Sequence, residues 1–461
     1  MEAKRGLNIS VKSFLAAIAV LLVLMVVTYT LTFVIPGGVY PRLADGSIDT
    51  AGEFAAVEGG IPFWKWILSP FLVLGASGNG TLIAVIAFLL VIGGVFNALD
   101  KGGLMSYMLD CIVGRFGHAR NRLMAVIVLF FMSMGAFIGS FEECVPLVPL
   151  VVALAVSLGW DAMVGLGMSL LAAGCGFASG VCNPFTVGVA QELAGLPMFS
   201  GLWLRLLGFA FIYGLLLGFL RFYARKIEKP LLIASAAQTE YNPASGRGLW
   251  CFAAILGLGI LLVLCSVFVP VLQDLTMIIV AVMFLTAGVT ASLVSGMKVR
   301  MLLSHFWNGL VSVFPAVLMI LMASSIRFVM EEAHILDTVL HGAVNLAEQL
   351  PQWVVILFVY LLVLGMNFFI SSGSAKAFLL MPLIVPLAAV FDLSPQLCVM
   401  AFAFGDGFSN VFYPTNPVLL ISLGLADVSY GKWVRWSWKF QTLNLALTSL
   451  LLLFGLAVGY R

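Results

Sequence analysis

The chain has 461 residues, of which 62% are hydrophobic and only 10% are charged, and its formal net charge is +2. Soluble domains are nearer half apolar and a quarter charged, so this chain cannot cover its own surface with polar groups. The composition therefore excludes a soluble globular protein. It predicts a polytopic membrane protein that contacts the lipid bilayer, and no nucleic-acid partner is expected.

Apolar runs of about 20 residues, the length that crosses a hydrocarbon core of ~30 Å, recur along the chain. We expect full crossings at 13–35, 81–99, 201–223, 248–272, 274–297, 304–328 and 432–458. Two further spans, at 163–194 and 395–424, are interrupted by polar and proline-containing stretches. Two apolar pairs, at 121–158 and 352–391, are each broken centrally by small polar residues, and we expect re-entrant hairpins there.

Between these spans, 102–117 and 331–349 have amphipathic spacing and are expected to lie along the membrane interface. The loop at 36–60 and the linker at 230–247 are expected to be solvated connections. Four tryptophans at span ends are expected to be interfacial anchors: Trp203, Trp433, Trp436 and Trp438.

Lysine and arginine set the expected orientation. With the N-terminus inside, 17 of the 23 lie in cytoplasmic segments, and Arg205 is among the few placed outside. We therefore expect a cytoplasmic N-terminus and an external C-terminus.

The same order of segments occurs twice, in 81–223 and 304–458, and the second series starts on the opposite side of the membrane. The stretch GLWLR at 201–205 matches GKWVR at 431–435, where the last span of each series begins, and both hairpins return through a Pro-Leu pair. Inverted repeats with broken helices are typical of secondary transporters. The predicted fold is all-α, with inverted structural repeats, two re-entrant hairpins and two broken helices. The alternative is two unrelated helical bundles with chance similarity.

Four polar stretches interrupt the apolar runs: Gly139–Cys144 and Ser371–Lys376 at the hairpin tips, and Ser179–Thr186 and Ser409–Pro417 in the broken spans. Backbone that is not helical cannot face lipid, since each unpaired amide costs several kcal/mol. Freed carbonyls, helix N-termini and polar side chains can instead hold an anionic group or a bare cation. We expect the solute to contact Ser140, Glu142, Glu143, Ser179, Asn183, Pro184, Thr186, Ser371, Ser372, Gly373, Ser374, Lys376, Asp406, Ser409, Asn410, Thr415 and Asn416.

The ionisable residues in these segments are candidates for function, because charge inside a membrane is costly. Glu142 and Glu143 either lie at a tip that reaches water, or place one carboxylate in the cavity to pair with a cation or carry a proton. Lys376 is either an exposed tip residue or a counter-charge to one of these glutamates or to a substrate carboxylate. Asp406 either caps a half-helix or binds a cation. A sodium ion, if the protein uses one, is expected near Asn183, Asn416 and Asp406.

Three stretches, GFASGVCNPFTVGVAQELAGLP, NFFISSGSAKAFLLMPLIVPLA and FAFGDGFSNVFYPTNPVLLISLG, closely resemble signature stretches of the YfcC family. That family is grouped with anaerobic C4-dicarboxylate carriers of the DcuC type in the ion transporter superfamily. The resemblance covers nearly the whole chain. It implies a homodimer in which each protomer has a scaffold domain and a transport domain that moves as an elevator. The scaffold would comprise 1–120, 201–350 and 432–461, and the two halves of the transport domain 121–200 and 351–431.

Substrates assigned to the wider group are basic amino acids exchanged as arginine for ornithine, C4-dicarboxylates and acylated amino acids, so the resemblance leaves the cargo open. The expected cavity holds one lysine against three acids, which favours a small zwitterionic or basic amino acid. The alternative is a sodium- or proton-coupled carrier of C4-dicarboxylates or other organic anions. No HExxH, GxSxG or P-loop motif is present, so we expect no enzyme and no organic cofactor. The energy would come from exchange or from a gradient of Na+ or H+.

Overall fold

The computed structural model describes residues 11–41, 53–76, 80–139, 141–197, 199–228, 242–266, 276–347 and 350–461. Each predicted crossing forms a helix within these ranges: α1 (Val11–Val34), α3 (Gly80–Lys101), α10 (Leu202–Ile227), α11 (Ser245–Ser266), α13 (Thr276–Val294), α14 (Val299–Glu332) and α20 (Tyr430–Ala457). The predicted end of the crossing at 248–272 lies outside the described residues. Large apolar side chains such as Trp250 and Phe314 are exposed on these helices, as expected of a surface that lipid covers.

Five helices of the described ranges are long and apolar enough to cross a membrane, judged by length and composition: Arg120–Ile138, Ala162–Ser179, Leu202–Ile227, Gly373–Val390 and Tyr430–Ala457. Helix α14 makes a sixth if its two parts, which meet at an angle of 40° after Pro315, count as one span. A proline in a helix removes a backbone hydrogen bond and favours such a bend. The chain is therefore a membrane protein, as its composition predicts.

The described parts of the loop predicted at 36–60, residues 36–41 and 53–60, contain two short strands. Strand β1 (Gly37–Val39) pairs antiparallel with β2 (Ala55–Val57), a small exception to the all-α prediction. Helix α2 (Phe63–Leu72) follows, and the sequence analysis does not anticipate it. The Tyr40 N–H donates to Asp337 Oδ2 at 2.9 Å, which ties this region to α15 (Ile335–Ala347).

Each of the four segments predicted to be a hairpin or a broken helix contains helices separated by a turn, and whether the hairpins are re-entrant stays a prediction. The first hairpin consists of α5 (Arg120–Ser133), a π-helical turn (Met134–Ile138), a 3-10 turn (Glu142–Leu147) and α6 (Val148–Ser157). The first broken helix consists of α7 (Ala162–Leu166), a π-helical turn (Gly167–Leu171), α8 (Ala172–Ser179), a second π-helical turn (Pro184–Gly188) and α9 (Val189–Leu193). The second hairpin is α16 (Gln352–Met366) and α17 (Gly373–Val390). The second broken helix is α18 (Pro395–Phe408), a 3-10 turn (Ser409–Val411) and α19 (Pro417–Leu425).

The tip of the second hairpin is not where the sequence places it. Helix α17 already begins at Gly373, so the tip is formed by residues 367–372 and Lys376 lies in the first helical turn. The Lys376 N–H donates to the Ser372 carbonyl at 3.0 Å, which closes that turn. The polar letters SSGSAK contain no proline, so nothing in the backbone prevents a helix from starting there.

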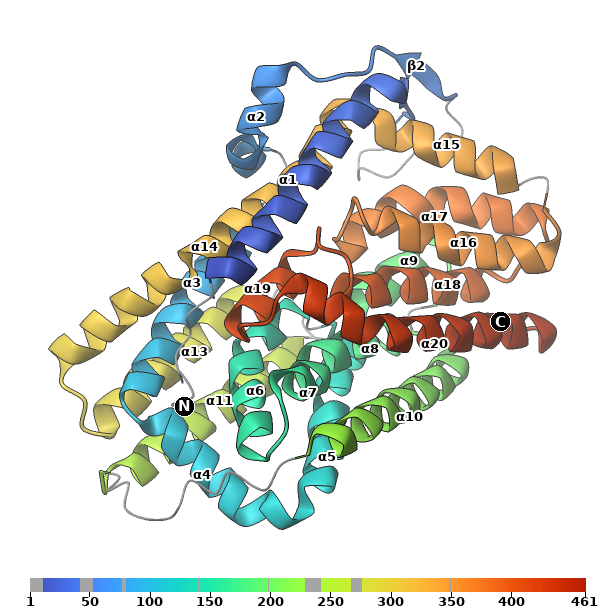
Figure 1. Ribbon diagram of the computed structural model, residues 1–461. Coiled ribbons are helices and arrows are strands. Elements are labelled where there is room, and N and C mark those ends of the chain that lie inside the picture. Colours follow the sequence, from blue (N-terminus) through green and yellow to red (C-terminus); the bar gives the residue numbers. More distant parts are fainter. Residues whose placement is uncertain are drawn as a thin grey trace.

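The order α3, α4 (Leu104–Phe116), α5, α6, α7–α8, α9, α10 recurs as α14, α15, α16, α17, α18, α19, α20. Corresponding helices pack on each other: α3 on α14, α8 on α18 and α10 on α20. Contacts between non-corresponding helices are also matched. Helix α6 of the first series packs on α19 of the second, and their counterparts α17 and α9 pack on each other in the same way. Figure 1 shows α4 and α15, the two helices predicted to lie along the interface, at opposite ends of the molecule.

Small residues allow the corresponding helices to cross at backbone contact. A Cβ atom added to Gly309 of α14 would lie 2.2 Å from the Gly93 carbonyl oxygen of α3. One added to Gly407 of α18 would lie 2.2 Å from the Ala178 Cα of α8. Close crossings of this kind are how helices associate in lipid, where the hydrophobic effect between helices is weak.

Candidate functional site

The breaks in the hairpins and the broken helices contact one another. A Cβ atom added to Gly139 of the first hairpin would lie 2.3 Å from Asn183 Oδ1 of the first broken helix. One added to Gly373 of the second hairpin would lie 2.5 Å from Thr186 Cγ2 and 2.7 Å from Asp406 Oδ2. The second hairpin therefore touches both broken helices, and the crossing at Gly407 joins those helices to each other. The polar segments form a single cluster from both halves of the chain.

At the centre of this cluster Lys376 and Asp406 form an ion pair in which both side chains are completely buried. The Lys376 ammonium group also donates to Asn367 Oδ1. The sequence analysis expects a glutamate of the first hairpin or a substrate carboxylate as the counter-charge of Lys376, and the structure gives Asp406 instead. Asp406 lies in the last turn of α18, so it caps no half-helix. A buried ion pair persists when its charges are paired and the remaining polar atoms are hydrogen-bonded, and here Asn367 supplies such a bond to the ammonium group while Asp406 Oδ2 has no partner among the described residues.

A chain of amides and one hydroxyl extends from this pair into the second broken helix. Asn367 Nδ2 donates to the Asp406 carbonyl at 2.9 Å, and lies 2.6 Å from Ser409 Oγ and 2.9 Å from Asn410 Oδ1. Asn416 Nδ2 donates to the same Asn410 oxygen at 2.9 Å. These bonds fix the non-helical backbone that the polar sequence predicts.

Both broken helices restart in the same way. Asn416 Oδ1 accepts the Val418 N–H at 2.9 Å, which caps the N-terminus of α19. Asn183 Oδ1 accepts the Phe185 N–H at 2.9 Å. An asparagine followed by proline suits the start of a helix, because the amide oxygen satisfies a free N–H and proline has none to satisfy.

The first hairpin brings a further carboxylate. Glu142 is partly buried in the 3-10 turn, close enough to Asp406 for the two charges to interact. Ser140 and the side chains of Glu143 and Pro184 lie outside the described residues. An acid of the first half therefore lies close to the ion pair of the second half.

The serines of the predicted site have different surroundings. Ser179 is buried, and its hydroxyl donates to carbonyls of its own helix at 2.7 and 3.0 Å, so it completes the last turn of α8. Ser371 and Ser374 are half-buried, and Ser372 is exposed. The Ser179 hydroxyl is thus used in hydrogen bonds to the backbone, whereas the three serines of the second hairpin lie nearer the surface.

Four buried polar atoms of the cluster have no hydrogen-bond partner among the described residues: Asn183 Nδ2, Thr186 Oγ1, Asp406 Oδ2 and Thr415 Oγ1. The great majority of buried polar groups in proteins are satisfied, so a group of unsatisfied ones calls for an explanation. Gly373 adjoins one of these atoms, Asp406 Oδ2, and the methyl group of Thr186. The cluster offers donors and acceptors that a polar solute can satisfy.

Residues 14–457 match the family described as C4-dicarboxylate anaerobic carrier, DcuC. The chain belongs to the DcuC family. It is 30% identical over 417 residues to the Escherichia coli (strain K12) protein described as "Putative basic amino acid antiporter YfcC", a match that covers 84% of this chain and 80% of the relative. An uncharacterized protein of Haemophilus influenzae (strain ATCC 51907 / DSM 11121 / KW20 / Rd) is 24% identical over 392 residues, which cover 82% of this chain and 76% of that protein. These matches indicate a membrane transporter and confirm the predicted family.

Two solved structures resemble this DcuC-family chain more distantly. The YdaH transporter of Alcanivorax borkumensis aligns with a TM-score of 0.46 and 18% identity, over 97% of this chain and 99% of YdaH. MtrF of Neisseria gonorrhoeae, from a class of antimetabolite efflux pumps, aligns with a TM-score of 0.46 and 15% identity, over 95% of this chain and 94% of MtrF. Neither likeness is close enough to transfer a function.

Asn367 is central to the site of this DcuC-family protein and is absent from the predicted set. It lies just after α16, and a single amide within an apolar run is its only signal in the sequence. Trp433 is also misplaced by the sequence, which predicts an interfacial anchor. Its indole is buried, and the ring N–H donates to the Val411 carbonyl at 2.7 Å in the second broken helix.

Arg205, which is expected on the external side of the membrane, is not among the predicted site residues. It is completely buried in the first turn of α10. Its Nη2 donates to the Ser200 carbonyl at 2.8 Å, whereas Nε and Nη1 have no partner in the described ranges. Arg205 is close enough to Cys182, the neighbour of Asn183, to interact with it electrostatically. It therefore adds a cation near the first break.

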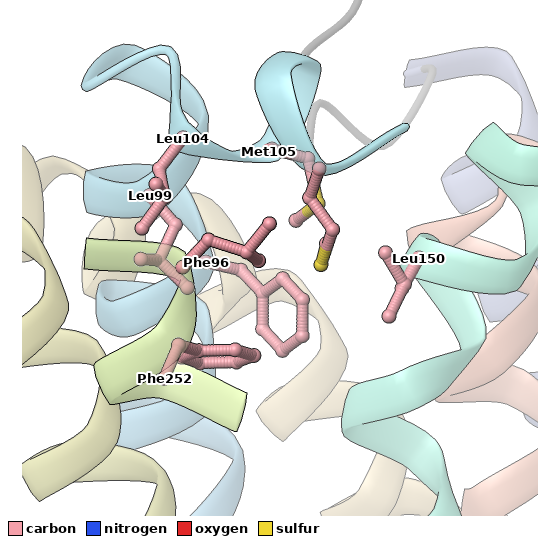
Figure 2. A pocket seen from close by; sticks show the side chains of 8 residues that line it. Phe96, Leu99, Leu104, Met105, Leu150 and Phe252 are labelled. Carbon is pink, nitrogen blue, oxygen red and sulfur yellow. The ribbon is translucent and has the colours of Figure 1, made fainter. Parts of the chain in front are cut away.

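A separate apolar pocket lies away from the polar cluster. Figure 2 shows Phe96, Leu99, Leu104, Met105 and Phe252 across from Leu150 of α6, and the remaining lining residues, Met108 and Leu249, are also apolar. No charged or polar side chain lines it, so it does not suit a charged solute. It marks where α3, α4 and α11 face the first hairpin.

Proposed function

We propose that this DcuC-family chain is a secondary active transporter for a basic or zwitterionic amino acid, working by exchange of the arginine/ornithine type or by ion-coupled uptake. Its solute binds where the four breaks meet. The observation that carries this proposal is the buried Lys376–Asp406 pair. The only lysine of the site is neutralised by the protein itself, so it is not free to attract a dicarboxylate.

The remaining polar groups suit a solute with an amine and a carboxylate. Asp406 Oδ2 and Thr186 Oγ1 are both unpartnered, their side chains both contact the position of Gly373, and each oxygen can accept a hydrogen bond from an ammonium group. Asn183 Nδ2 is an unpartnered donor that can meet a carboxylate. Glu142 has no ion-pair partner among the described residues and supplies negative charge for a cationic side chain. The relative described as an antiporter of basic amino acids favours the same cargo.

We further propose that the two halves are inverted repeats and that the hairpins and broken helices move as an elevator against the other spans. The reciprocal contacts of α3 with α14, α8 with α18 and α10 with α20 support a two-fold relation between the halves. The separation of α4 and α15 supports opposite orientations (Figure 1). The proposal includes a homodimer in a bacterial inner membrane with a cytoplasmic N-terminus, as the distribution of lysine and arginine favours.

Arg205 favours the alternative, a carrier of C4-dicarboxylates or other organic anions. A buried guanidinium group with two unpartnered nitrogens attracts a carboxylate, and arginine binds carboxylates in a two-pronged geometry. The description of the matched family also names C4-dicarboxylates. In this case succinate would be transported, and Arg205→Gln would abolish its uptake.

The deciding experiment is counterflow in proteoliposomes with labelled arginine, ornithine and succinate. We expect arginine and ornithine to exchange, and Glu142→Gln to reduce exchange at least about tenfold, since 1.4 kcal/mol of lost ion pairing already gives that factor. Glu58→Gln, which alters an exposed glutamate, serves as the matched control and should behave as the unaltered protein. Succinate uptake that is insensitive to Glu142→Gln would refute the amino acid proposal.

A further inference from the structure

Of the side-chain oxygens expected to hold a sodium ion, only Asp406 Oδ2 is without a partner among the described residues. Asn183 Oδ1 and Asn416 Oδ1 each accept a backbone N–H two residues later, both at 2.9 Å. Asp406 Oδ1 is paired with Lys376. Hard cations are held by several convergent oxygens that are free to coordinate. The described residues therefore do not fit a sodium ion at the predicted place.

The ammonium group of Lys376 has surroundings that resemble those of a bound cation. It contacts two oxygens, Asp406 Oδ1 and Asn367 Oδ1, and is completely shielded from solvent. Asn367 cannot turn away easily, because its Nδ2 is held by acceptors in the second broken helix at 2.6 to 2.9 Å. The two oxygens are thus fixed around a positive charge that belongs to a side chain of α17.

We propose that Lys376 is a tethered internal cation, which occupies the place of a co-transported sodium ion and makes solute binding independent of Na+. The inference rests on the proposed transport function and specifies how its site is neutralised. Lys376 links the second hairpin to the second broken helix, as an ion bound between them would. The charged groups that face it are Asp406 on α18 and, beyond Asp406, Glu142 of the first hairpin.

Two consequences follow from a tethered cation. The unaltered protein should not respond to Na+ specifically. Removal of the lysine side chain by Lys376→Ala should leave Asp406 Oδ1 and Asn367 Oδ1 around an empty space, and these two oxygens together with water that enters the space can coordinate Na+. The substitution should therefore create a sodium site that the native chain lacks.

The test is thermal unfolding of the purified, detergent-solubilised full chain in NaCl and in choline chloride at equal ionic strength. No solute is needed, so the result does not depend on which solute the protein carries. We expect the same Tm in both salts for the unaltered protein. For Lys376→Ala we expect a Tm that rises with NaCl and saturates, because a ligand that binds only the native state stabilises it by mass action.

The double variant Lys376→Ala/Asp406→Asn should lose that rise, and Lys432→Ala, an exposed lysine of α20, should match the unaltered protein. If Lys376→Ala does not fold, exchange by the unaltered protein in proteoliposomes decides: its rate should be the same with Na+ or choline on both sides. A specific rise in Tm of the unaltered protein with NaCl, or exchange that falls about tenfold or more without Na+, would overturn the proposal. A folded Lys376→Ala variant with no response to Na+ would also overturn it.

Discussion

Removal of the ammonium group from the central ion pair should cost a large part of the stability of the fold. In Lys376→Met the aliphatic chain is kept, and the carboxylate of Asp406 stays behind in a site with no solvent exposure. Breaking a buried pair by removal of one partner costs about 3–5 kcal/mol, because an uncompensated charge remains. Asn367 Oδ1 loses its donor as well. We expect a loss in this range, well above the roughly 0.5 kcal/mol typical of surface substitutions.

The assay is a double-mutant cycle of unfolding free energies in detergent, with Lys376→Met, Asp406→Asn and the combined variant. The combined variant should recover most of the loss, since a neutral pair leaves no buried charge. Lys432→Met, on an exposed lysine, is the matched control. A loss below about 1 kcal/mol for Lys376→Met, or a combined variant as unstable as the sum of the single ones, would refute the reasoning.

Three further substitutions test other parts of the cluster. Thr186→Val removes a buried hydroxyl that has no partner, so Tm should not fall while exchange slows at least about tenfold; a parallel loss of Tm and transport would contradict its role in the site. Gly407→Ala places a methyl group 2.2 Å from the backbone of the first broken helix and should lower both Tm and transport, whereas Gly431→Ala, with open space around it, should change neither. Trp433→Phe leaves a carbonyl of the second broken helix without its donor and should cost about 1–3 kcal/mol in chemical unfolding. The same change at the exposed Trp438 should have no measurable effect.

Hydropathy and helix-breaking residues predict most of the helices. The thickness of the bilayer sets the length of a span, and backbone groups inside the bilayer must hydrogen-bond to each other. The order of spans, hairpins and broken helices follows from these two constraints. The predicted position of the second hairpin's tip is wrong, because polar residues do not by themselves interrupt a helix. Gly373 begins α17, and Lys376 is drawn inside by a partner 30 residues away.

The candidate site is predicted as a set of residue types but not as a set of partners. The sequence finds Lys376 and Asp406 because charge is rare in the apolar runs, and it cannot show that they neutralise each other. Asn367 and Arg205 escape notice for opposite reasons. One is a single amide beside a more conspicuous polar stretch, and the other is a cation near a span end that the sequence analysis uses only to assign the side of the membrane.

The backbone contact between the broken helices has a consequence for the kinetics of transport. With Gly407 set against Ala178, the two helices leave no room to slide or tilt past each other, and they act as one stiff unit. In the proposed elevator movement, this unit and the first hairpin move together past the other spans and the lipid, and the side chains that face Leu150 of that hairpin are apolar (Figure 2). Turnover should therefore respond to the thickness and fluidity of the surrounding bilayer.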